Sequence, residues 1–281
     1  MATGLWPALK LGASNGVLMG GYPFARNQYF VGANSPVFGV RVDNLQALFD
    51  RLVSGDIAFI GPGSYDEEDL VIDTPNVTII GAGNRGQIGI APSAVGGNGL
   101  QILADGVTLV NVGCAKESTA DFALKVGSQT ISPDRFRAYG CKIEGDGIAA
   151  HLQGAGDVIM DDCEFCWCGS ALILESNDIG FNTQIRIKNS LFHNYVTVGL
   201  GQFAAAQQVN DLWLIDNVFA RQEDGTVGTD DILLADNGNT GLITGNRFPR
   251  ATNGTGFITI GTGLIYNPNG TEAGWSTARP A

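Results

Sequence analysis

The sequence is poor in charged residues, and above all in bases. Asp, Glu, Lys and Arg make up 16% of the 281 residues, whereas about a quarter is usual in soluble proteins. The 16 Lys and Arg are outnumbered by 28 Asp and Glu, which gives a net charge of −12 at pH 7. Nucleic-acid binding requires clustered Lys and Arg that contact phosphates. We therefore expect no nucleic-acid partner.

Long hydrophobic runs are also missing. No run of about 18 apolar residues occurs, so we expect neither a transmembrane helix nor a membrane partner. The segment Met1–Pro7 has no basic region and no smooth apolar region, and so does not resemble a secretory signal peptide. We expect synthesis in a reducing compartment. The five cysteines, an odd number, cannot all pair within one chain.

Amphipathic helical patterns of ten or more residues do not separate the apparent strands, which excludes a βαβ protein. Glycine is abundant instead, with 40 residues, and it shows no three-residue period, which excludes collagen. Apolar residues make up 44% of the chain, enough for a sizeable core. These features favour an all-β domain with many turns.

A repeat of about 27 residues runs through most of the chain. Each copy has an alternating strand, then Gly, Asn or Asp, then a variable pair, and then an apolar or aromatic residue. The copies are Val77–Asn84, Val107–Cys114, Phe136–Ile143, Val158–Phe165, Ile185–Phe192, Leu212–Phe219 and the weaker Leu242–Phe248. A second short strand follows most of them, at Ile148–Leu152, Ala171–Leu174, Val196–Leu200, Ile232–Leu234 and Phe257–Ile260. Such repeats predict a parallel β-solenoid with one coil per copy.

Stacked coils place equivalent side chains above one another at about 4.8 Å. We therefore expect an aromatic column of Phe165, Phe192 and Phe219, and we expect Cys141 and Cys163 to be neighbours in another buried column. Gly and Asn accept the left-handed backbone at the corners between sheets, which explains the high glycine content.

The segment that precedes the repeats is more specific. It contains an amphipathic helix (Leu45, Leu48, Phe49, Leu52), Gly55-Asp56, the strand Ile57–Ile60, Gly61-Pro62-Gly63-Ser64-Tyr65, the strand Leu70–Ile72 and then Val77–Gly81. This order resembles the opening of the pectate-lyase-like right-handed β-helix superfamily, and the resemblance covers roughly residues 40–265. It implies an all-β, right-handed parallel β-helix of about eight coils, with a short N-terminal capping helix and extended terminal arms.

Three regions follow from this assignment. Residues 1–40 form an aromatic, glycine-rich arm, residues 41–265 form the β-helix, and residues 266–281 form a polar tail. Because the arm has no core of its own, we expect it to dock on a partner subunit, and the alternative is that it folds back along its own solenoid. The docking residues are expected to be Trp6, Tyr22, Phe24, Tyr29, Phe30 and Phe38.

Members of the superfamily are often polysaccharide lyases or hydrolases, so we looked for their sites. Arg186-Ile187-Lys188 matches an R-I-K motif of polygalacturonase-like enzymes, but the accompanying N-T-D and G-H-G motifs are missing. Strand alternation alone predicts Ile187 inward and its two basic neighbours outward. No acidic cluster recurs on one face as a calcium site would require.

Three acids remain as weak catalytic candidates. Asp162 and Asp216 hold the same repeat position two coils apart, which corresponds to roughly 9.6 Å, at the edge of the range for inverting glycosidases. Glu164 flanks Asp162. Solvated turn acids are far commoner than catalytic pairs, and turn acids are the interpretation we favour.

The cysteines suggest a second kind of site. Cys163, Cys166 and Cys168, together with Cys141, could bind zinc, but the fourth ligand is unclear and free cysteine is among the most buried residue types. We favour core packing and expect no metal and no cofactor.

The predicted architecture resembles that of bacteriophage decoration proteins, head spikes and tailspikes, and enzyme motifs are missing. The resemblance therefore implies a non-enzymatic structural protein of a phage virion, assembled in the host cytoplasm. It is expected to form a homotrimer and to contact major capsid or tail proteins. The alternatives are a tailspike-like depolymerase that binds host surface polysaccharide through Trp167, Trp213 and the acids, and a carbohydrate-binding solenoid.

Overall fold

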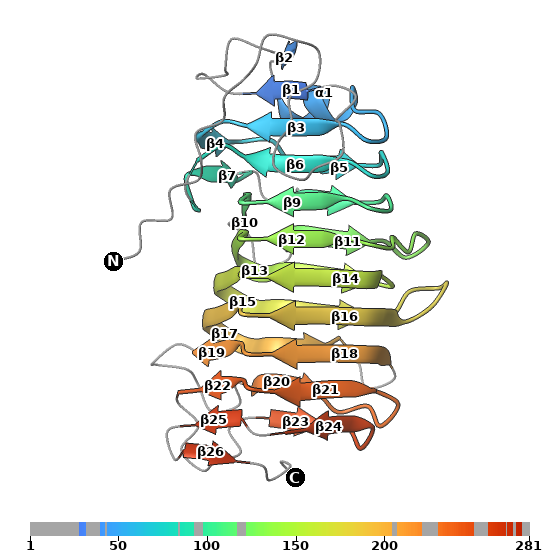
Figure 1. The fold of residues 1–281 in the computed structure, drawn as a ribbon, viewed down its shortest axis with the longest axis vertical. Coiled ribbons are helices and arrows are strands. Elements are labelled where there is room, and N and C mark those ends of the chain that lie inside the picture. The colour runs from blue at the N-terminus through green and yellow to red at the C-terminus, as the bar shows by residue number, and fades with distance from the viewer. Residues whose placement is uncertain are drawn as a thin grey trace.

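The protein is a stack of parallel β-coils (Figure 1). The computed structural model describes residues 28–31, 40–42, 44–83, 85–92, 98–116, 122–203, 207–220, 230–249, 258–267, 269–271 and 274–276. Four of the expected docking residues, Trp6, Tyr22, Phe24 and Phe38, lie outside these ranges.

The first sheet runs along the front of the molecule in Figure 1 and has eleven strands within the described residues. In spatial order they are β2 (Val40–Val42), β1 (Gln28–Val31), β3 (Ile57–Ile60), β6 (Thr78–Gly81), β9 (Thr108–Val110), β12 (Arg137–Tyr139), β14 (Gly156–Asp161), β16 (Asn182–Lys188), β18 (Val209–Ile215), β21 (Gly241–Thr244) and β24 (Leu264–Tyr266). All of their pairings are parallel.

A second, bent sheet closes the coils. Its main path is β26 (Gly274–Ser276), β25 (Asn269–Thr271), β22 (Arg247–Phe248), β19 (Val218–Ala220), β17 (Leu191–Gln202), β15 (Glu164–Glu175), β13 (Lys142–Gln153), β10 (Gly113–Lys116), β7 (Ile88–Ile90) and β4 (Gly63–Tyr65). Beside this path lie β5 (Leu70–Ile72), β8 (Leu100–Ile102), β11 (Phe122–Gly127), β20 (Asp230–Leu234) and β23 (Ile258–Ile260). The all-β class predicted from the sequence is confirmed, and the number of coils differs slightly from the eight expected.

The core lies inside the coils and consists of columns of equivalent side chains. Phe165, Phe192, Phe219 and Phe248 are stacked with ring centroids 4.6, 4.5 and 5.2 Å apart. This confirms the predicted aromatic column and extends it by one ring. The distance between ring centroids is close to the separation of neighbouring strands. Each ring belongs to a different coil, and the strands that carry the rings pair in register.

A ladder of buried asparagines stabilises one corner. The backbone N–H of Ser190 donates to Asn217 Oδ1 at 3.0 Å, that of Asn217 to Asn246 Oδ1 at 3.0 Å, and that of Asn246 to Asn269 Oδ1 at 2.9 Å. The three asparagines are fully buried. Each amide thus satisfies the corner N–H of the coil before it, which would otherwise be buried without a partner.

The helix α1 (Leu45–Phe49) covers the N-terminal end of the stack (Figure 1). Asn44 caps it by accepting from Ala47 N at 2.7 Å, and Glu67 accepts from the free N–H groups of its first turn. Its apolar side chains Leu45, Leu48 and Phe49 are buried. Among the described residues, no helix has the length and apolar character needed to cross a membrane.

The two ends of the stack include segments that the sequence analysis assigned to arms. The strand β1 pairs with β3, and β2 pairs with β1, so the first sheet begins within residues 1–40. Tyr29 packs on the core, and its hydroxyl donates to the Arg51 carbonyl at 3.3 Å. At the other end, β25 pairs with β22 and β26 turns back antiparallel on β25.

Candidate functional site

The two acids of the predicted catalytic column, Asp162 and Asp216, lie at corners where the chain leaves the first sheet. Both have a left-handed backbone with φ of 54°, and Asn189, in the coil between them, has φ of 52°. Gly140 and Gly245 hold the equivalent corners on either side, with φ of 61° and 69°. Asp, Asn and Gly are the residues that tolerate this conformation. The corner geometry therefore accounts for both acids without any catalytic role.

Asp162 also has a partner of its own. Its carboxylate lies 2.5 Å from the Arg85 guanidinium, which donates as well to the carbonyls of Gly140 and Asp162. The arginine therefore connects the corners of two neighbouring coils. Because the Asp162 side chain is 71% exposed, this ion pair contributes little to stability.

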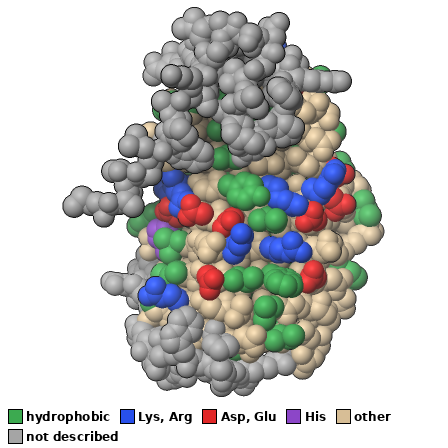
Figure 2. Space-filling model, viewed as in Figure 1, with side chains coloured by type: hydrophobic (Ala, Val, Ile, Leu, Met, Phe, Trp, Pro, Cys, Tyr) green, Lys and Arg blue, Asp and Glu red, His purple; other side chains and the backbone are tan. Residues whose placement is uncertain are grey.

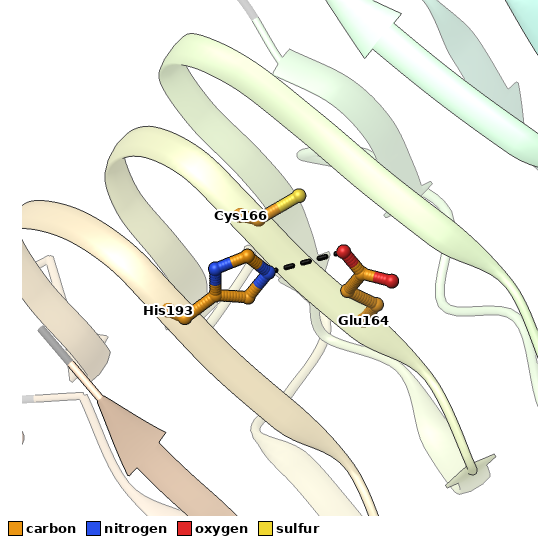
Figure 3. Close-up of side chains that lie close together, drawn as sticks. All are labelled: Glu164, Cys166 and His193. Carbon is orange, nitrogen blue, oxygen red and sulfur yellow. Dashed lines mark hydrogen bonds and ion pairs between the residues drawn. The ribbon is translucent and has the colours of Figure 1, made fainter. Parts of the chain in front are cut away.

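Glu164 belongs to a different group of side chains, on the outside of the second sheet (Figure 3). It opens β15, and its Oε1 lies 3.0 Å from Nε2 of His193 on β17. Cys166 lies beside both and is fully buried. Phe165 and Phe192 are paired and face the core, so the residues next to them along each strand face away from it. The coil register thus brings Glu164, Cys166 and His193 together.

Two residues of the preceding strand complete this group. The Cys166 thiol donates to Glu144 Oε2 at 3.7 Å, and Lys142 Nζ lies 2.5 Å from the same oxygen. Glu144 and Cys166 are register partners, as are Lys142 and Glu164. We call Lys142, Glu144, Glu164, Cys166 and His193 the β15 cluster. It contains two carboxylates from adjacent coils, whereas the sequence analysis paired Asp162 with Asp216 and placed Glu164 beside Asp162.

Burial and charge in the β15 cluster shift the pKa values of its titrating groups in different directions. Burial alone would raise the pKa of Glu164, but the hydrogen bond from His193 and the nearby positive charge of Lys142 outweigh it and lower the pKa. Burial raises the pKa of the Cys166 thiol, and the two carboxylates add to this despite Lys142. Burial opposes the charge of Lys142, yet the carboxylates raise its pKa. At neutral pH Glu164 is ionised and Cys166 is a thiol.

The residue types and pKa shifts of the β15 cluster limit the chemistry that it could support. A nucleophilic cysteine needs a depressed pKa, so Cys166 is not an activated nucleophile. Two carboxylates on adjacent coils are the groups that glycoside hydrolysis uses. An imidazole, a carboxylate and a thiol side by side are also a set of metal ligands.

The other predicted zinc ligands do not join the β15 cluster. Cys141, Cys163 and Cys168 are buried in the core. The Cys163 thiol contacts Cys141 and donates to the Ala138 carbonyl at 3.5 Å, as expected for neighbours in one column. Cys166 lies on the opposite side of its strand, so the four-cysteine site considered for these residues is not assembled.

A bulge beside the β15 cluster carries the exposed Trp167. Cys166 pairs with His193 and Cys168 with Tyr195, and the residues between them, Trp167 and Asn194, both have left-handed backbones with φ of 51° and 54°. The Trp167 side chain is 60% exposed. It therefore offers an aromatic surface next to the carboxylates.

The outward face of the first sheet mixes hydrophobic side chains with charged ones of both signs (Figure 2). Trp213 Nε1 donates to Asp211 at 2.5 Å, and the Arg186 guanidinium lies 5.8 Å from the indole centroid. Lys188 Nζ lies 3.0 Å from Asp161 on the neighbouring strand. Ile187 is fully buried, so the R-I-K segment alternates inward and outward as predicted.

A further polar group lies between β11, β13 and β15. His151 Nε2 is 2.8 Å from Glu175 Oε2, but outside hydrogen-bonding geometry. Burial, and then the charge of Lys125, lower the pKa of His151 to about 4. His151 is therefore neutral at pH 7, and it lies between Phe122, which it contacts edge to face, and Phe203, whose ring is tilted against it.

No family model matches the sequence. Among solved structures, the chain is similar to a pectin methylesterase from Aspergillus niger, with a TM-score of 0.62 and 14% identity over 91% of this chain and 89% of that one. It is also similar to the pectate lyase Pel9A, with a TM-score of 0.67 and 9% identity over 88% of this chain and 69% of that one. The ORF18 protein of Geobacillus virus E2 has a TM-score of 0.50 and 11% identity over 80% of this chain and 56% of that one. At these identities the likeness concerns the fold, and the chain has the pectate-lyase-like parallel β-helix fold that both enzymes and the viral protein share.

Proposed function

We propose that the chain is a non-enzymatic structural component of a bacteriophage particle, a capsid decoration protein or a head or tail spike. The observation that carries this proposal is the structural role of the corner acids. Asp162 and Asp216 occupy the left-handed corner position that Asn189, Gly140 and Gly245 occupy in other coils. The Asp162 carboxylate is paired with Arg85. The likeness to a viral protein of the same fold agrees with it.

In this proposal the aromatic N-terminal arm docks on a major capsid or tail protein, and the solenoid meets two further copies of itself. The outward face of the first sheet is suited to self-association. It exposes Tyr139, Trp213 and Ile265 among charged side chains of both signs (Figure 2). Exposed apolar side chains rimmed by polar ones are typical of interfaces between subunits.

The test is the mass of the full chain in solution, measured by multi-angle light scattering over a range of concentrations. We expect three times the chain mass, and we expect Trp213→Asp to reduce it to one chain mass. Phe181→Asp is the matched control, because Phe181 is 43% exposed and belongs to the loop before β16 rather than to a strand of this sheet. A full chain that stays monomeric at every concentration would contradict the trimer. A truncation that begins at Gln28 keeps β1 and tests the arm separately.

A depolymerase is the second candidate, and the β15 cluster is the observation that favours it. Glu144 and Glu164 are adjacent carboxylates next to the exposed Trp167, on a fold that polysaccharide-active enzymes share. The chain should be incubated with host surface polysaccharide and assayed for new reducing ends and unsaturated products. Cleavage that Glu164→Gln abolishes and Asp216→Asn leaves intact would replace the structural proposal with this one.

A further inference from the structure

Three different ligand types meet in the β15 cluster. One carboxylate oxygen of Glu164, the Cys166 sulfur and one ring nitrogen of His193 lie within 4.8 Å of one another (Figure 3). Nitrogen, sulfur and carboxylate oxygen together are the donor set of zinc and similar divalent transition metals. Calcium and magnesium prefer oxygen ligands alone.

The spacing of these atoms is near that of a metal site. Ligand atoms around a tetrahedral zinc ion are about 3.3–3.6 Å apart, as its bond lengths of about 2.0–2.3 Å require. Glu164 Oε1 and His193 Nε2 are already 3.0 Å apart. A side-chain movement of about 1 Å is enough to bring the sulfur within bonding distance of an ion held by the other two.

The backbone that carries these residues is fixed on both sides. The strand β15 pairs with β13 and β17, and β17 pairs in turn with β19 and β20. The ligand-bearing positions therefore cannot spread apart, and binding does not require the chain to order itself. Preorganisation of this kind is a condition for a tight site.

Cys166 is hard to explain by packing alone. It is fully buried, yet it lies on the outward side of β15 among Glu144, Glu164 and His193 rather than in the apolar core, where the other four cysteines lie. Its thiol makes a long hydrogen bond of 3.7 Å to Glu144. A thiol is a weak donor, so a serine or threonine would satisfy these polar neighbours better.

We propose that Glu164, Cys166 and His193 bind one divalent transition-metal ion of the zinc class. Three protein ligands leave the fourth tetrahedral position for water or for Glu144. The ion takes the place of the thiol proton, which is released to solvent. The proton on His193 Nε2 moves to Nδ1, so the neutral imidazole offers the Nε2 lone pair to the ion. The Lys142 ammonium, held by Glu144 at 2.5 Å, opposes the ion electrostatically. The bound ion links β15 to β17, two successive coils of the solenoid.

The test uses the untagged full chain and titrates it with Co²⁺, whose bond to a thiolate has its own near-ultraviolet absorption. We expect one Co²⁺ per chain, displacement by Zn²⁺ and no competition from Ca²⁺. Cys166→Ser should abolish the thiolate absorption. Glu164→Gln and His193→Gln should each weaken binding at least tenfold, since even loss of an outer partner of a metal ligand costs about 10–100-fold. Lys142→Met should tighten Co²⁺ binding, because it removes the positive charge that opposes the ion.

Two control variants distinguish Co²⁺ binding at this site from nonspecific Co²⁺ binding elsewhere on the chain. His151→Gln changes the other histidine, and Cys114→Ala changes a cysteine of the core, so both should bind Co²⁺ like the wild type. Circular dichroism confirms that each variant is folded. Should Cys166→Ser fail to fold, the glutamate and histidine variants still decide the question. Failure of the wild type to bind Co²⁺, or unchanged binding in all three ligand variants, would overturn the proposal. Neither result bears on the phage structural proposal.

Discussion

At the scale of single residues, the sequence of the corners follows from backbone geometry. The corner after the first sheet is left-handed in successive coils, and Gly140, Asp162, Asn189, Asp216 and Gly245 occupy it in turn. A left-handed residue other than glycine costs about 1–2 kcal/mol, and least for Asn and Asp, whose short polar side chains bond locally. The left-handed backbone conformation is therefore a sufficient reason for acidic residues at these corners.

Asp216 provides the test of this argument. Asp216→Gly should leave the stability unchanged within about 0.5 kcal/mol, whereas Asp216→Val should destabilise the chain by about 1–2 kcal/mol, because a β-branched residue is strained at this φ. The midpoint of guanidinium unfolding, followed by circular dichroism, measures both. Equal stability of the valine and glycine variants would show that the corner conformation does not govern this position.

At the scale of elements, one strand from each of four coils contributes a ring to the phenylalanine column. Phe192 and Phe219 each contact a ring on both sides, whereas Phe165 and Phe248 each contact one ring. Truncation of an inner ring leaves a cavity that the paired strands around it cannot close by moving.

Phe192→Ala should therefore destabilise the chain by about 3–5 kcal/mol, and Phe192→Leu by clearly less. Phe181→Ala is the control, because this side chain is 43% exposed and its loss should cost no more than about 0.5 kcal/mol. Denaturant unfolding of the three variants gives the comparison. A loss at Phe192 no larger than at Phe181 would mean that the column is not part of the stabilising core.

The same column shows how far the sequence could predict the structure. Because side chains of one repeat position are stacked, an alignment of the copies was enough to place the phenylalanines, the Cys141–Cys163 pair and the second strands. That alignment also puts Cys166 beside His193, which is the signal for the β15 cluster. Strand alternation from Phe165 and Phe192 also turns both side chains outward, but it does not show that Lys142 and Glu144 reach them from the neighbouring strand.

The asparagine ladder could not be predicted for a different reason. Asn217 and Asn246 look like ordinary turn residues in the sequence, and only the register shows that each amide accepts from the N–H of the coil before it. The partners of Glu164 likewise depend on long side chains that reach across strands. Such contacts depend on side-chain conformation, which periodicity does not determine.

At the scale of the whole molecule, the coils enclose one continuous core that contains most of the sulfur. Cys114, Cys141, Cys163, Cys166 and Cys168 are all buried and unpaired. Burial raises the pKa of Cys114 and of Cys168 to about 12. The thiolate is the reactive form, so a raised pKa makes these thiols less reactive at a given pH.

We expect the native chain to react only slowly with a disulfide reagent such as dithiobis-nitrobenzoate at pH 8. The thiolate fraction of a group with a pKa of about 12 is roughly 10⁻⁴ at that pH, and burial keeps the reagent out. In guanidinium the thiols regain an ordinary pKa, and all five should react within minutes. Rapid modification of Cys114 or Cys168 in the folded chain, located by mass spectrometry, would contradict the closed core.

The parallel register of the two sheets also has a mechanical consequence. Every bond between one coil and the next, whether a backbone hydrogen bond or an asparagine of the ladder, runs along the long axis of the molecule. The strands of each coil pair only with those of the next coils, so a tensile force along this axis loads the coil junctions in series, and the weakest junction sets the breaking force regardless of length. A force across the axis is instead shared by covalent backbone within each coil. The molecule should therefore resist a force across its long axis far better than stretching from end to end.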